Sequence, residues 1–279
     1  LYEMYKGQYI FADKMWYYYE NHRWTQDLDA FCLRSKISKE LVAEYLIIMS
    51  ENNEKSSEIS DEDDDEGQGN EIRAMNKKIM SIVKDLKTSS YKDNVTKECK
   101  ELFQDKDFIG KLDTNEYLIG FDNGVYDLRR MEFRDGRPDD YLTFTTGTDY
   151  AINYDEDPCI EDIEDFMDQL ISNEEVKEYT LLLLASMMQG INAEEKFRIW
   201  TGSGGNGKSK LLELFITSFG EYCIKFPVTL LTGKRAASNA PTPEIVQSKG
   251  KRFGYFDEPN ENEHINIGLM KEYSGNDKV

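Results

Sequence analysis

The stretch Phe197 to Phe219, FRIWTGSGGNGKSKLLELFITSF, decides which fold the chain can adopt. Its short apolar run, Phe197–Trp200, predicts a β-strand. The following turn, Gly202–Ser209, matches the spacing GxxxxGK[ST]. Apolar residues then recur at helical intervals: Leu211, Leu214, Phe215 and Phe219. Strand, glycine loop and helix in this order predict a phosphate-binding loop in an α/β domain.

The residues of this loop suit the phosphates of a nucleoside triphosphate. Glycines let successive backbone N–H groups turn inward, and the helix N-terminus adds its partial positive charge. We expect Lys208 to neutralise the β and γ phosphates and Ser209 to bind Mg²⁺. A chance match in a glycine-rich loop is the alternative, and the flanking strand and helix argue against it. The residues predicted to bind ATP are Gly202, Ser203, Gly204, Gly205, Asn206, Gly207, Lys208 and Ser209.

A second apolar strand is expected at Phe253–Phe256, and two carboxylates follow it directly. We expect Asp257 to coordinate magnesium, directly or through water, and Glu258 to activate the attacking water. Two surface acids after a buried strand would look the same. Their position, 49 residues after Lys208, favours the catalytic interpretation.

The charge of the chain excludes binding of nucleic acid by bulk attraction. There are 34 Lys and Arg against 54 Asp and Glu, a net charge of −20. The excess lies before residue 191, because residues 191–279 carry 12 basic and 11 acidic residues. Contacts with DNA must therefore be local. Lysine and arginine clusters at residues 234–235 and 249–252 flank the expected strands, and a solvated flank is an equal alternative for both.

Cysteine and hydropathy patterns point to a cytosolic compartment. The four cysteines are at least about sixty residues apart, without metal-ligand spacing, so we expect reduced thiols. His22 and His264 have no neighbours that would form a metal or catalytic site. The longest apolar stretch, residues 179–188, is too short to span a bilayer, and no signal peptide opens the chain. A first residue other than Met, and an end inside a motif, suggest part of a longer polypeptide.

The N-terminal half is expected to contain several segments. Residues 1–50 are aromatic-rich and mostly helical in pattern, with Ser38 as a candidate helix cap. Their aromatic cluster, Trp16–Tyr19 with Trp24, could stack on bases, but burial in a small core is favoured. Residues 51–70 carry six consecutive acids and predict a disordered linker. An amphipathic helix is expected from Ile72 to Leu86.

The middle of the chain changes to strand periodicity. Residues 117–128 predict a hairpin with a type I′ turn at Asn123-Gly124, and residues 141–150 predict another strand. Asp157-Pro158 is expected to open a helix, and a further helix is expected from Glu174 to near Gly190. We place the boundary between the two domains close to Gly190.

These motifs together resemble a known family. GSGGNGKS at 202–209, KRFGYFDEP at 251–259 and LMKEYSGND at 269–277 are similar to the A, B and B′ motifs of superfamily 3 helicases, which are AAA+ motors. Upstream, LIGFDNGVYDL at 118–128 and the segment 133–141 resemble the N-terminal module of the poxvirus-type helicase–primases of large nucleocytoplasmic DNA viruses. Trp24 and residues 31–37 resemble the segment before that module.

The resemblance implies a hexameric ring that moves along single-stranded or forked DNA, driven by ATP and Mg²⁺ in the host cytoplasm. A primase domain usually precedes this module in the same polypeptide. Lys271, in the B′ motif, and Lys278 are the implied DNA contacts. Family members continue into a DNA-binding hairpin, a sensor asparagine and an arginine finger. The chain ends at Val279, before these groups, so we do not expect normal turnover from it alone.

We therefore expect a mainly helical N-terminal module with a small β element, followed by an incomplete P-loop AAA+ domain with a mostly parallel sheet. The expected divisions are residues 1–50, 51–70, 71–190 (a collar-like module) and 191–279 (the ATPase domain). The leading functional hypothesis is an ATP-dependent replicative DNA helicase fragment. Two alternatives are a nucleotide-bridged assembly or collar module, and a P-loop nucleotide enzyme that does not translocate. For the latter we find no arginine-rich lid.

Overall fold

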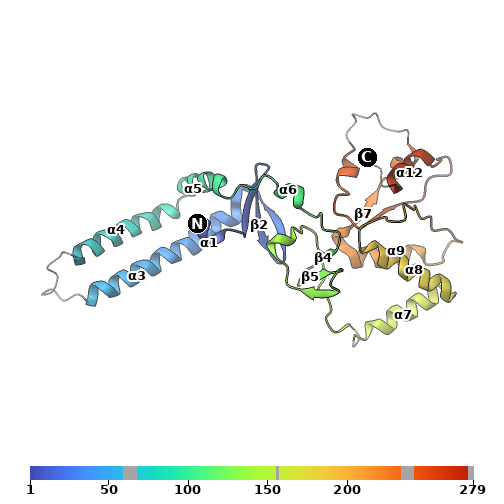
Figure 1. Cartoon of the computed structure of the whole chain (residues 1–279), viewed down its shortest axis with the longest axis horizontal. Helices are drawn as coiled ribbons and strands as arrows, with labels where there is room; N and C mark the ends of the chain where they lie inside the picture. Colours follow the sequence, from blue (N-terminus) through green and yellow to red (C-terminus); the bar gives the residue numbers. More distant parts are fainter. Residues whose placement is uncertain (59–67, 155–156, 234–241, 276–279) are drawn as a thin grey trace. The chain divides into compact units, whose positions relative to one another are not determined.

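The computed structural model describes residues 1–58, 68–154, 157–233 and 242–275. The chain forms two compact units. The first contains residues 1–20 and 24–109, and the second contains residues 21–23 and 110–279. The expected boundary near Gly190 falls inside the second unit. Figure 1 shows the elements of each unit, and they are described separately below.

The first unit opens with a three-stranded antiparallel sheet. After α1 (Tyr2–Tyr5) come β1 (Tyr9–Ala12), β2 (Met15–Glu20) and β3 (Arg23–Asp27), in the order β1-β2-β3. The predicted helical pattern is thus wrong for residues 9–27. Runs of tyrosine and tryptophan favour strands. The turn residues Asp13 and Lys14 have φ values of +46° and +63°, which is the backbone of a two-residue type I′ hairpin.

The aromatic cluster packs into the core, as predicted. Trp16, Tyr17 and Trp24 are 4%, 7% and 2% exposed. The ring of Trp16 meets Phe103 edge to face at 5.5 Å, and Trp24 meets Phe108 at 5.0 Å. Burial of these large rings stabilises the unit and leaves them unavailable for stacking on bases.

Helices complete the first unit. They are α2 (Phe31–Lys36), a wide turn at Ile37–Leu41, α3 (Val42–Glu58), α4 (Gln68–Leu86), α5 (Ser89–Leu102) and α6 (Phe108–Lys111). Helices α3 and α4 run side by side (Figure 1), and the amide of Asn76 bonds to both Asn52 and Asn53 at 3.0 and 2.7 Å. The predicted helix over Ile72–Leu86 is confirmed.

Two expectations for this region need correction. Ser38 does not cap a helix, because its hydroxyl donates to the carbonyl of Arg34 inside a continuous helical run. The predicted disordered linker, 51–70, is wrong at both of its ends. Residues 51–58 end α3 and residues 68–70 begin α4, since pairing of the two helices stabilises polar turns that the sequence alone leaves unsupported. The six acids lie within residues 59–67, outside the described residues.

The second unit begins with the predicted hairpin. Strands β4 (Leu118–Phe121), β5 (Gly124–Asp127) and β6 (Glu132–Arg134) form an antiparallel sheet. The expected Asn123-Gly124 turn is wrong, because Phe121 pairs with Gly124 and the loop residues are Asp122 and Asn123, without positive φ. Gly124 is instead required by close approach: a Cβ there would lie 2.7 Å from the carbonyl oxygen of Arg134.

Residues 141–150 do not form the expected strand, although they follow β4 closely. The Thr146 N–H donates to the carbonyl of Gly120, and the Asp122 N–H donates to that of Thr148. Before the Thr146–Gly120 bond, the hydroxyl of Tyr222 interrupts the ladder. It accepts from the Gly120 N–H at 2.7 Å and donates to the Phe144 carbonyl at 3.0 Å. A buried side chain here replaces one rung of backbone pairing.

The helices predicted after this segment are confirmed as α7 (Cys159–Leu170) and α8 (Glu174–Met187). Asp157 accepts from the Cys159 N–H at 2.9 Å, and Asn173 caps α8 through the Val176 N–H at 3.0 Å. The expected strand at Phe197–Trp200 does not form. Its backbone pairs with neither strand of the adjacent sheet, although the ring of Phe197 lies 5.8 Å from that of Phe256.

The remainder of the unit surrounds a two-stranded parallel sheet. Its elements are α9 (Lys208–Phe219), β7 (Cys223–Phe226), α10 (Thr229–Thr232), α11 (Pro243–Val246), β8 (Phe253–Phe256) and α12 (Ile267–Ser274). Strands β7 and β8 pair in parallel, with Cys223 opposite Phe253. Among the described residues, no helix has both the length and the apolar character needed to cross a membrane.

Candidate functional site: the glycine loop and the end of β8

The glycine loop lies directly before α9, as its sequence predicts. Gly205 and Gly207 have φ values of +72° and +79°, where L side chains are strained, and α9 begins at Lys208. The Lys208 ammonium donates to the amide oxygen of Asn206 at 2.8 Å. A Cβ on Gly202 would lie 2.2 Å from the Asn206 amide nitrogen, so this side chain folds back across the loop. The first N–H groups of a helix have no partner within the helix itself, so this end of α9 suits an anion.

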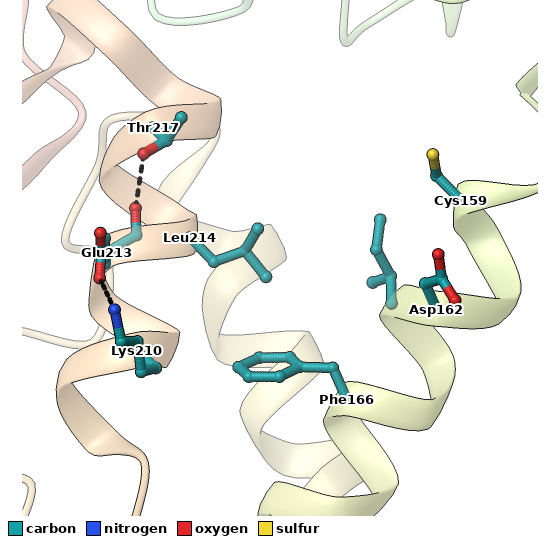
Figure 2. A pocket seen from close by; sticks show the side chains of 8 residues that line it. Cys159, Asp162, Phe166, Lys210, Glu213, Leu214 and Thr217 are labelled. Atoms are coloured by element: carbon teal, nitrogen blue, oxygen red, sulfur yellow. Dashed lines mark hydrogen bonds and ion pairs between the residues drawn. The ribbon is translucent and has the colours of Figure 1, made fainter.

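Helix α7 packs against this loop. A Cβ on Gly207 would lie 2.0 Å from a methyl carbon of Leu170, so the glycine is needed for close approach as well as for its positive φ. Beyond this contact an open groove of about 440 Å³ separates α7 from α9. Figure 2 shows Phe166 and Leu214 pointing toward each other across it. On the α9 side, the first residue that lines the groove is Lys210. None of the loop residues 202–209 lines it. It is therefore not the phosphate site.

Aromatic packing holds α9 against the second predicted strand. The ring of Phe215, on α9, meets Phe253 of β8 edge to face at 5.0 Å. At the other end of β8, Phe256 stacks on Phe226 of β7 at 5.3 Å. The two ring pairs fix the helix that follows the loop and the strand that precedes the acids within one core.

Asp257 and Glu258 follow the end of β8, both exposed to solvent. The Asp257 carboxylate lies 2.7 Å from the Lys225 ammonium of β7, and this hydrogen bond raises the pKa of Lys225. Within the described residues, no hydrogen bond or ion pair joins either acid to the glycine loop. A divalent cation at Asp257 would therefore displace Lys225, and the two positive charges would compete for one carboxylate.

Of the two lysines implied as DNA contacts, the structure describes only Lys271. Lys271 lies on α12, exposed, and the helix is capped by the Asn266 side chain, which accepts from the Gly268 N–H at 3.0 Å. Lys278 lies outside the described residues, as do Lys234 and Arg235. No group of three or more His, Cys, Asp or Glu residues in the described part of the chain could hold a metal ion by itself.

The structure assigns an internal role to a basic pair that the sequence left open as a DNA contact or a solvated flank. The Arg252 guanidinium donates to four backbone carbonyls, at 2.8 Å to Gln189 and Leu118 and at 3.0 Å to Asn115, with Glu116 as the fourth. Lys251 lies 3.8 Å from the centre of the Phe144 ring, and burial lowers its pKa. Both residues directly precede β8. Arg252 bonds to the chain around β4, and the Lys251 ammonium donates to the Glu221 carbonyl.

Tyr222 completes this junction from the other strand. The Arg252 N–H donates to its carbonyl at 2.8 Å, and burial raises the pKa of its phenol, so the hydroxyl stays protonated and donates to Phe144. Its neighbour Glu221 accepts from the Thr145 N–H at 2.9 Å. The sequence analysis missed Tyr222 and Glu221. Their only signal was their position immediately before β7. They fasten the β4–β6 hairpin to the sheet that carries Asp257 and Glu258.

Removal of the Arg252 guanidinium should strongly destabilise the second unit. We expect Arg252→Ala to lower the free energy of unfolding by about 3 kcal/mol, because four carbonyls, two of them in part-buried bonds, lose one charged donor. Arg130→Ala is the matched control. Arg130 is 65% exposed, and we expect a change within about 0.5 kcal/mol. Urea denaturation followed by circular dichroism measures both, and equal midpoints for the two variants would contradict the assignment.

With this geometry established, the chain can be compared with known proteins. The family described as D5 N terminal like matches residues 1–172, well over half of the chain. The chain belongs to this family. Its relatives are helicases and primases of large DNA viruses by name, so it is a member of the viral helicase–primase family.

Three relatives illustrate the range of similarity. A provisionally named helicase of Acanthamoeba polyphaga mimivirus is 38% identical over 269 residues, which is 95% of this chain and 27% of the relative. A provisionally named helicase of Invertebrate iridescent virus 3 is 27% identical over 299 residues, 99% of this chain and 32% of the relative. A provisionally named primase of African swine fever virus is 27% identical over 190 residues, which is 66% of this chain and 19% of the relative. The chain thus spans a third or less of these relatives.

Proposed function

We propose that this chain is the N-terminal module and the first part of the ATPase domain of a replicative DNA helicase. One observation carries the proposal: a GxxxxGKS loop stands at the N-terminus of α9, and α9 packs on the strand that ends in Asp257-Glu258. In this scheme the loop residues Gly202–Ser209 cradle the phosphates of ATP, and Ser209 and Asp257 hold Mg²⁺. Glu258 activates the water that attacks the γ-phosphate.

The scheme fits the resting geometry. Lys208 is held by Asn206, an uncharged partner, and a phosphate would displace that amide readily. Asp257 is paired with Lys225, and a bound cation would replace the lysine at this carboxylate. Family membership supports the coupling of hydrolysis to movement on single-stranded DNA, the hexameric AAA+ ring and the association with a primase domain.

The test is the rate of ATP hydrolysis by the complete polypeptide that contains this chain, measured with Mg²⁺ and with or without single-stranded DNA. We expect DNA to stimulate hydrolysis at least several-fold, since a translocating motor couples the two. A rate indifferent to DNA would overturn the motor and favour a P-loop enzyme that does not translocate. Nucleotide binding without hydrolysis would favour an assembly module bridged by ATP.

A further inference from the structure

The first unit contains a pocket that the proposed ATPase site does not use. It has a volume of about 730 Å³ and lies between the β1–β2 turn, the Asp27–Arg34 segment and α5. Four basic side chains line it, together with two aromatic rings: Lys14, Arg34, Lys97, Lys100, Phe11 and Trp16. Three acids line the pocket as well, Asp27, Asp29 and Asp93, so the lining has one more basic side chain than acidic ones in a chain of net charge −20.

The backbone positions these cations rigidly. Lys14 is the second residue of the type I′ turn, with φ of +63°, and Ala12 and Met15 pair on either side of it. Lys97 and Lys100 are three residues apart on α5 and so share one face of the helix. The Lys100 ammonium lies 5.0 Å from the centre of the Phe11 ring. The chain after α5 bonds to β1 through the Phe11 N–H, which donates to the Phe103 carbonyl at 2.9 Å.

The carboxylates of the pocket leave these lysines unneutralised. Asp27, 2% exposed, uses both oxygens to accept from the backbone N–H groups of Cys32 and Leu33 at 2.9 and 3.2 Å. Asp93 is paired with Arg34. Asp29 is the remaining acid of the lining. Among the described residues, Lys14, Lys97 and Lys100 are exposed and form no ion pair, which leaves a surplus of positive charge.

The pocket also has an exposed apolar side chain in its lining. Leu28 is 66% exposed, and Phe31, three residues later in the chain and outside the lining, is 74% exposed. They flank Asp29 and Ala30, both with φ of +54°, a left-handed backbone that is costly for side chains other than glycine. Cations with exposed apolar and aromatic surface match a strand that carries phosphates and unpaired bases. An inorganic anion would use the cations alone.

We propose that this pocket binds the backbone of single-stranded nucleic acid, with Lys14, Lys97 and Lys100 on phosphates and a base against the exposed side chain of Leu28. The site lies in the family module, apart from the loop and acids of the ATPase half, and it rests on the proposed action on DNA. It gives the acidic chain a local attractive surface where bulk charge repels nucleic acid.

The first experiment measures affinity by fluorescence anisotropy. A labelled oligothymidylate of roughly 20 nucleotides is titrated with the whole 279-residue chain, without ATP. Lys14→Glu, Lys97→Glu and Lys100→Glu in one variant should raise Kd at least about tenfold. Loss of three phosphate contacts should also flatten the slope of log K against log salt by about 2. Affinity equal to that of the control would overturn the proposal.

The control variant carries the same change of charge on the same unit. Lys77→Glu, Lys78→Glu and Lys84→Glu alter exposed lysines of α4, outside the pocket, and should change Kd by less than about threefold. If the two triple variants weaken binding equally, only net charge matters and the pocket is not the site.

A second measurement uses the unaltered chain, so it does not depend on how a variant folds. Lysines are acetylated briefly with and without the oligothymidylate, then quantified by mass spectrometry. We expect DNA to protect Lys14, Lys97 and Lys100 at least about threefold and to leave Lys77 and Lys78 unchanged. Protection by ATP in place of DNA would show a nucleotide site and overturn the proposal.

The result can be separated from the fate of the proposed ATPase. DNA-stimulated hydrolysis with no effect of the pocket lysines would refute this site alone. If the unaltered protein hydrolyses no ATP but the pocket variant still loses DNA binding, the proposed motor alone is refuted.

Discussion

Lys208→Ala is expected to reduce ATP hydrolysis by the complete polypeptide at least about 100-fold. Lys208 is the first residue of α9, and its ammonium bonds only to the Asn206 amide in the described structure. Alanine keeps the helix and the turn glycines but removes the one positive side chain at the loop. Charge that develops on the β and γ phosphates then loses this side chain and is stabilised only by the backbone N–H groups and Mg²⁺.

The control for this prediction is Lys210→Ala, one residue beyond the motif. Lys210 is exposed and paired with Glu213 at 2.8 Å, within the same helix. Its removal should change the rate by less than about twofold, because an exposed ion pair contributes little. Steady-state phosphate release with saturating Mg²⁺ and DNA compares the variants. If Lys210→Ala lost as much activity as Lys208→Ala, the loop would not be the phosphate site.

The sequence predicted the loop and the helices well because local signals determine both. The turn glycines at 205 and 207 need positive φ, and the apolar spacing of α7, α8 and α9 matches the helices found. The helical prediction for residues 9–27 failed because adjacent aromatics carry no clear period. There two-residue turns with positive φ at non-glycine residues determine the sheet, and such turns have a weak sequence signal.

Long-range contacts explain the remaining errors. Asn123-Gly124 is typical of a type I′ turn, but Asn123 bonds instead to both backbone groups of Tyr150, at 2.8 and 3.1 Å, and shifts the loop by one residue. Arg252 follows Lys251 in a run that resembles a basic surface patch. Its guanidinium instead donates hydrogen bonds to carbonyls that are more than sixty residues away in the chain. No local pattern encodes either contact.

The same distinction applies to the candidate site. The sequence could place Asp257 and Glu258 at the end of a strand, and the structure confirms β8 directly before them. It could not show that Lys225, opposite on β7, holds Asp257 in the resting state, because that pairing depends on the register of two strands distant in sequence. If Asp257 binds magnesium as proposed, the cation must compete with this lysine for the carboxylate.

Glu258→Gln should separate nucleotide binding from hydrolysis. We expect the affinity for ATP to change by less than about threefold while hydrolysis falls at least about 100-fold, because glutamine keeps the size of the side chain but cannot take a proton from water. Glu258 is exposed at the end of β8 and forms no bond to the loop in the described structure, so its removal leaves the phosphate cradle intact.

The matched control is Glu261→Gln, three residues later and also exposed. Removal of its charge should leave the ATP affinity and the hydrolysis rate within about twofold, and this result would show that loss of one exposed negative charge after β8 is not enough. Binding of a fluorescent ATP analogue and phosphate release, measured on the same preparations with Mg²⁺, give the two quantities. Hydrolysis at the normal rate in Glu258→Gln would make Glu258 a surface acid and require another base. A parallel loss of affinity would instead place Glu258 among the magnesium ligands, where Asp257 is proposed to act.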